Sequence, residues 1–138
     1  MKPVPPALLS ATITLLAVFF YFFTAFRVGQ LRGKHDIRAP ATSGHPEFDR
    51  AYRVQLNTLE QLGLFLPLLW LATLYPLLGA WIAAAVGVVW LVARVLYARA
   101  YMADPDKRLI GAGLTGLCTI ALLILALIGI GMGWLGLR

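Results

Sequence analysis

Charged residues are scarce in this sequence: they make up 13% of its 138 residues, whereas hydrophobic residues make up 60%. A soluble domain of this length has too little interior to hide so much apolar surface from water. The lipid bilayer must therefore be the solvent for most of the chain. The length allows a single domain, so we expect residues 1–138 to form one integral membrane domain.

Cysteine and the common metal and phosphate motifs are also missing. The single cysteine, Cys118, lies inside an apolar run, which excludes an internal disulfide, and we expect it to pack rather than to react. The chain contains no CxxC, no HExxH and no glycine-rich phosphate loop. His35 and His45 lie ten residues apart beside Pro46, a weak metal pair that we interpret as solvated loop. We therefore expect no metal.

Long uncharged runs occupy most of the chain, at residues 3–26, 61–78, 79–93 and 109–137. The first is too long for the apolar region of a secretory signal, so we expect it to remain as a spanning helix. Pro76 and Gly79 mark a turn between the second and third runs. Because a spanning helix needs about 20 residues, each of these two must extend into its polar flank. The prediction is an all-α, four-transmembrane-helix bundle, with spans at about 5–32, 48–77, 79–103 and 107–135.

Basic residues are concentrated in the two connections on one side of this bundle and at the adjoining helix ends. They are Arg27, Arg32, Lys34, Arg38, Arg50 and Arg53 in the first connection, and Arg94, Arg99, Lys107 and Arg108 in the second. Only Lys2 and Arg138 remain for the opposite side. Since positive charge marks the cytoplasmic side of membrane proteins, we expect both connections in the cytoplasm. Topology thus accounts for the net charge of +6 without a nucleic-acid partner.

A polar face precedes the second apolar run. At 100° per residue, Arg53, Asn57 and Glu60 share one narrow face of a helix, whereas Gln55 points away from it. Counting back about 20 residues from the end of the run places Asn57 and Glu60 near the bilayer boundary. Ionisable groups at that depth are costly to keep without a partner, which favours a ligand site over salt bridges and snorkelling to headgroups.

A second polar face lies at the end of the third span. Arg94, Tyr97 and Tyr101 follow one another at spacings of three and four residues, and Arg108 begins the fourth span. Cations, an amide and a carboxylate opposed by two phenols suit a small zwitterionic ligand that carries carboxylates and an amine. The two faces together predict a binding site at the edge of the membrane.

Two stretches of the sequence resemble a known family. "PEFDRAYRVQLNTLE" and "ARVLYARAYMADPDKRLIG" are similar to the two signature blocks of the MAPEG family, the membrane-associated proteins in eicosanoid and glutathione metabolism. The resemblance covers nearly the whole chain. It is nearest to the branch with leukotriene C synthase and microsomal glutathione transferases two and three, where Gln rather than His follows the Arg by two residues.

The resemblance implies a homotrimer that binds glutathione between subunits near the cytoplasmic face. It implies a set of residues that hold the tripeptide, namely Arg53, Asn57, Glu60, Tyr97 and Tyr101, and two that the neighbouring subunit supplies, Arg32 and Gln55. Arg108 matches the arginine that stabilises the glutathione thiolate. Gln61 replaces a tyrosine and Gly33 a second arginine of leukotriene C synthase, which argues against leukotriene synthesis as such but not against glutathione binding.

The function implied is that of a membrane glutathione S-transferase, with glutathione as co-substrate and a lipophilic electrophile as its partner. Reduction of lipid hydroperoxides by the same site stays open, as does a non-catalytic, lipid-binding relative within the family. A four-helix multidrug exporter is disfavoured because its first span needs a carboxylate and residues 3–26 contain none. We expect a bacterial inner membrane, with the endoplasmic reticulum as the alternative, and a site that faces the cytoplasm.

Overall fold

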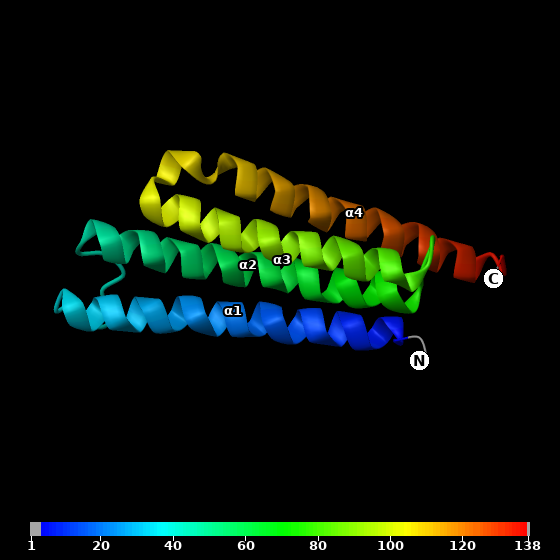
Figure 1. The fold of residues 1–138 in the computed structure, drawn as a ribbon, viewed down its shortest axis with the longest axis horizontal. Coiled ribbons are helices and arrows are strands. Elements are labelled where there is room, and N and C mark those ends of the chain that lie inside the picture. Colours follow the sequence, from blue (N-terminus) through cyan, green and yellow to red (C-terminus); the bar gives the residue numbers. More distant parts are fainter. Residues whose placement is uncertain (1–3, 138) are drawn as a thin grey trace.

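The computed structural model describes residues 4–137 as a bundle of four long helices (Figure 1). These are α1 (Pro6–Lys34), α2 (Pro46–Leu74), α3 (Ala80–Ala103) and α4 (Leu109–Trp134), with a short 3₁₀ helix, η1 (Pro105–Arg108), before α4. No strand occurs between residues 4 and 137. The predicted all-α architecture is therefore confirmed.

The connections divide between the two ends of the bundle. The α1–α2 loop and η1 lie at one end, and the α2–α3 turn lies at the other together with the start of α1 and the end of α4 (Figure 1). The polar connections predicted from charge thus share one end of the molecule. Lys2 and Arg138, the basic residues assigned to the opposite side, fall outside the described residues.

Proline and glycine set the helix limits. Proline occupies the first turn of α1, α2 and η1, where its missing N–H is not needed. α2 ends at Leu74, slightly before the expected limit of 77, because Pro76 disfavours helical geometry at Tyr75. Gly79 then starts α3 with a φ of 103°, a conformation that side chains rarely adopt.

The core runs along the middle of the bundle. The rings of Phe65 and Trp90 stack at a centroid distance of 3.8 Å and join α2 to α3. Ser10 and Thr73 form a buried hydrogen bond of 2.7 Å that joins α1 to α2. A satisfied polar pair of this kind suits a bundle in lipid, where an unpaired hydroxyl would be costly.

Large apolar side chains cover the outside of the bundle, among them Phe19, Phe22, Ile110 and Leu117. By length and composition, three helical segments are able to cross a bilayer: α1, α3, and η1 together with α4. α2 carries its charged residues in its first half and an apolar run in its second. The protein is thus an integral membrane protein, and a fourth span through α2 stays a prediction.

Candidate functional site

A polar cavity of about 190 Å³ lies between α2, α3 and the start of α4. It contains four of the residues predicted for glutathione: Asn57, Glu60, Tyr97 and Arg108. They come from three separate segments of the chain, the first half of α2, the last turns of α3 and η1. The helical spacing that placed Asn57 and Glu60 on one face of α2 therefore also aims them at α3 and α4.

Two aromatic residues connect the members of this group. The phenol oxygen of Tyr97 accepts a hydrogen bond from the amide Nδ2 of Asn57, which joins α3 to α2. The rings of Tyr97 and Tyr101 lie 5.6 Å apart, and the guanidinium of Arg108 lies over the Tyr101 ring at 5.5 Å. Arg108 also donates from Nη1 to the carbonyl of Pro105 at 3.3 Å, and its side chain is otherwise exposed. The cationic end of the site thus rests on an aromatic surface.

Arg94 belongs to the same cavity, although the sequence prediction left it out of the binding residues. It is 2% exposed, donates from Nη2 to the hydroxyl of Thr58 at 2.9 Å, and lies over the Tyr97 ring at 4.2 Å. It forms no ion pair with any residue between 4 and 137. The signal was present in its spacing from the two tyrosines, but spacing alone does not reveal that a guanidinium is buried.

Two buried polar atoms at this cavity lack partners. Arg94 Nε and Gln61 Oε1 make no hydrogen bond within the described part of the chain. Because buried polar groups are normally hydrogen-bonded, a donor and an acceptor are left for a molecule that enters the cavity. Gln61, noted above as a departure from the leukotriene C synthase pattern, therefore lines the site itself.

A larger hollow of about 600 Å³ lies beside the start of α2 and the end of α3. It is lined by the remaining two predicted residues of this subunit, Arg53 and Tyr101. Arg53 is exposed, one helical turn before Asn57. Arg50 lines the same hollow and donates to the carbonyls of Met102 and Ala103 at 3.1 and 3.3 Å. It thereby satisfies acceptors at the C-terminal end of α3, where positive charge is favourable.

Arg32 and Gln55 lie outside both hollows. Arg32 Nη1 donates to the carbonyls of Ile37 and Ala41 at 3.2 and 3.0 Å, so it organises the loop between α1 and α2. Its guanidinium also lies 4.9 Å from the centre of the Phe48 ring. Gln55 is half-buried on another face of α2. One chain therefore does not bring these two residues to the others, and their supply by a neighbouring subunit stays a prediction.

Gly111 holds the two sides of the cavity together. A Cβ at this position would lie 2.6 Å from the backbone N and Cα of Tyr97. α4 and α3 therefore approach one another more closely here than any side chain allows. Since Arg108 lies one turn before Gly111, this contact sets the separation between Arg108 and the tyrosines of α3.

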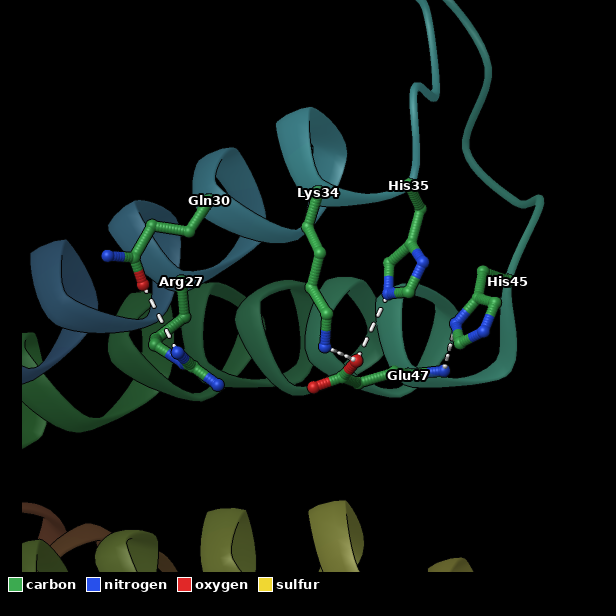
Figure 2. A network of polar contacts seen from close by, with 6 residues as sticks. All are labelled: Arg27, Gln30, Lys34, His35, His45 and Glu47. Carbon is green, nitrogen blue, oxygen red and sulfur yellow. Dashed lines mark hydrogen bonds and ion pairs between the residues drawn. The ribbon is translucent and has the colours of Figure 1, made fainter.

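His35 and His45 lie at the two ends of the loop, as interpreted, but they are partly buried rather than solvated. The two residues are ten apart in sequence but lie side by side, because the loop runs from the end of α1 back to the start of α2 (Figure 2). The two rings stack with centroids 3.6 Å apart and planes 13° from parallel. His35 Nε2 lies 3.0 Å from Glu47 Oε2, and His45 Nδ1 accepts the backbone N–H of Glu47 at 3.2 Å.

Comparisons with known proteins agree with the two sequence motifs. The family model described as "MAPEG family" matches residues 10–128. An uncharacterized protein of Synechocystis sp. is 44% identical over 120 residues, which cover 87% of this chain and 86% of that protein. Leukotriene C4 synthase of Cavia porcellus is 38% identical over 122 residues, covering 88% and 80%. Microsomal glutathione S-transferase 2 of Mus musculus is 37% identical over 123 residues, covering 88% and 82%.

Proposed function

The chain belongs to the MAPEG family, as its two motifs predicted, and from this premise we propose that it is a membrane glutathione S-transferase. It would join the sulfur of glutathione to a lipophilic electrophile. The observation that carries the proposal is the convergence of Asn57, Glu60, Tyr97 and Arg108 on one cavity between α2, α3 and the start of α4.

We assign glutathione binding to the charges around the two hollows. The Glu60 carboxylate is a suitable acceptor for the ligand ammonium, and the exposed guanidinium of Arg53 is a suitable donor to a ligand carboxylate. The adjoining hollow has the volume of small-molecule sites, about 300–1,000 Å³. The unpartnered Arg94 Nε and Gln61 Oε1 match the carbonyls and amides of a peptide. Arg32 and Gln55 would come from the next subunit of a homotrimer, which completes the predicted set.

Arg108 is the proposed catalytic residue. A thiol with a pKa of about 8.5 is mostly protonated at neutral pH, and the thiolate is the reactive nucleophile. A guanidinium about 4 Å away favours the thiolate by up to about 4 kcal/mol at an effective dielectric constant near 20, before desolvation is subtracted. Such pairing lowers a pKa by roughly one to three units.

The chemistry then proceeds through the bound thiolate. Its sulfur forms a bond to the electrophilic carbon. In a substitution the leaving group departs with the electron pair of the bond that breaks, and in an addition the anion formed on the conjugate takes a proton from water. The exposed apolar surface of the helices supports access for a lipophilic partner from the bilayer, while glutathione arrives from water. Reduction of a lipid hydroperoxide by the same thiolate consumes two glutathione molecules and gives a disulfide, an alcohol and water.

The bacterial relative supports a bacterial inner membrane, with the predicted site on its cytoplasmic side.

A non-catalytic, lipid-binding member of the family is the alternative function. The transferase and the non-catalytic protein differ in the ionisation state of bound glutathione, because only the transferase needs the thiol as a thiolate at neutral pH.

Titration of the purified protein with glutathione, followed by ultraviolet absorbance of the thiolate, tests the proposal. We expect a saturable thiolate signal near neutral pH that Arg108→Ala removes, together with conjugation of a general electrophile. Glutathione binding without a thiolate signal would favour the non-catalytic alternative. Absence of glutathione binding would refute the proposed function.

A further inference from the structure

His35, His45 and Glu47 form a compact cluster where the end of α1 and the start of α2 lie side by side (Figure 2), and none of the three lines either of the two hollows. His35 follows the last residue of α1, His45 is the N-cap of α2, and Glu47 lies in the first turn of α2. One nitrogen of each imidazole and a carboxylate oxygen all lie within 4.8 Å of one another. All three side chains are partly buried.

We propose that this cluster binds a divalent first-row transition-metal ion, for which Zn²⁺ is the best match. Two imidazoles and one carboxylate are a ligand set that holds zinc in proteins, with a fourth position for water. At bond lengths of about 2.0–2.1 Å, tetrahedral donor atoms lie about 3.3 Å apart. His35 Nε2 and Glu47 Oε2 already lie 3.0 Å apart, so the third donor has only a short distance to close.

The donor atoms are of the kinds that bind such ions. Imidazole nitrogen suits zinc, copper, iron and nickel, and a carboxylate oxygen is a further zinc ligand. Both histidines and Glu47 each bring one such atom into the cluster.

Binding requires three local changes. His35 Nε2 donates to Glu47 Oε2, so its proton has to move to Nδ1 before this nitrogen can bind a metal. Because a ring nitrogen donates in the plane of the ring, two parallel rings cannot both point at one ion, so His45 has to rotate. That rotation exchanges the hydrogen bond to the Glu47 N–H for a metal bond. The ammonium of Lys34, 2.7 Å from Glu47 Oε2, must also leave, and its exposed side chain is free to swing into water. Lys34 and the metal therefore compete for one oxygen.

Titration of the full-length protein with Co²⁺ in detergent, without a histidine tag and without glutathione, tests the site. We expect one ion per chain, a visible spectrum typical of four-coordinate Co²⁺, and its displacement by Zn²⁺. Because the chain has only two histidines, the variants His35→Asn and His45→Asn test every imidazole that could bind the ion. Asn is a good N-cap, so His45→Asn keeps the start of α2. Each variant should bind at least about tenfold more weakly, since even outer partners of metal ligands are worth that much.

Two further variants make the test specific. Asp36→Asn removes an acid of the same loop that lies outside the cluster, and its positive φ of 49° is one that Asn tolerates. It should leave Co²⁺ affinity unchanged, whereas Lys34→Ala should raise it. The proposal is overturned if the protein binds no stoichiometric Co²⁺, or if both histidine variants bind as well as the parent. An equal loss in Asp36→Asn, or an unchanged affinity in Lys34→Ala, would also overturn the three-ligand site.

Discussion

Replacing Gly111 with alanine tests whether the α3–α4 contact positions the site. The new Cβ would lie 2.6 Å from the backbone of Tyr97, whereas carbon atoms in contact rest about 3.5–4.0 Å apart. The obstacle is main chain rather than a flexible side chain, so α4 must move away by about 1 Å. Arg108 lies one turn before Gly111 and would move with it.

The magnitude follows from two opposing effects. Overpacking a tight contact costs about 1–3 kcal/mol, while alanine in place of glycine in a helix returns up to about 1 kcal/mol. We expect a net loss of stability of about 1–2 kcal/mol. The effect on turnover should be larger, because a misplacement of about 1 Å at an active site can cost about 100-fold.

Gly113→Ala is the matched control, since it lies on the same helix and a Cβ there would meet no atom within 4 Å. Thermal unfolding in detergent and kcat/KM with glutathione and a general electrophile measure the two effects. Gly113→Ala should be neutral or slightly stabilising in both assays. If Gly111→Ala unfolds and turns over like the parent, the close approach does not position Arg108 and Tyr97.

Four further predictions concern single side chains. Arg53→Ala should weaken glutathione affinity, measured by calorimetry, with little change in the turnover of saturated enzyme, because the lost contact is made equally in the ground state and in the transition state. A loss confined to kcat would contradict this. Arg108→Ala should keep its glutathione affinity at high pH, raise the pKa of the bound thiol and lower turnover, which alkaline pH should partly restore. An unchanged pH–rate profile would mean that Arg108 only anchors α4. Thr58→Val leaves the buried Arg94 Nη2 without its acceptor, and should cost about 1–3 kcal/mol in thermal unfolding; an unchanged unfolding temperature would show that Arg94 finds another partner. An inactive Gln55→Ala should be rescued in mixed oligomers by subunits that carry Gln55 but lack Arg108, and no rescue would argue against a shared site.

The helices and one face of the site follow from local pattern. Apolar runs with Pro76 and Gly79 between them predict where helices lie, because the bilayer demands long apolar segments. Asn57 and Glu60 reach the same cavity because helical spacing alone fixes their common face. No tertiary information was needed for either result.

Features that depend on which helices meet were not predictable. Arg94 is buried because Thr58 and Tyr97 from two different helices close around it, and periodicity on α3 cannot show that. The pairing of His35 with His45 depends on the path of a loop, whose residues carry no periodic signal. The sequence therefore did not show that these two rings are partly buried against one another.

The charges around the two hollows explain why a chain would extend arginines towards a bilayer. Arg94, Arg108, Arg50 and Arg53 face only Glu60 and Asp49 there, so four positive charges against two negative ones leave a surplus of +2.

That surplus has a consequence for the proposed ligand. Glutathione carries two carboxylates and one ammonium, and ionising its thiol adds a further negative charge. A surplus of positive charge in a partly desolvated site binds the more negative form better. By linkage, whatever favours bound thiolate over bound thiol lowers the thiol pKa by the same free energy. The surplus of positive charge would therefore also help to ionise the thiol of the tripeptide, and the thiol pKa should rise in Arg108→Ala.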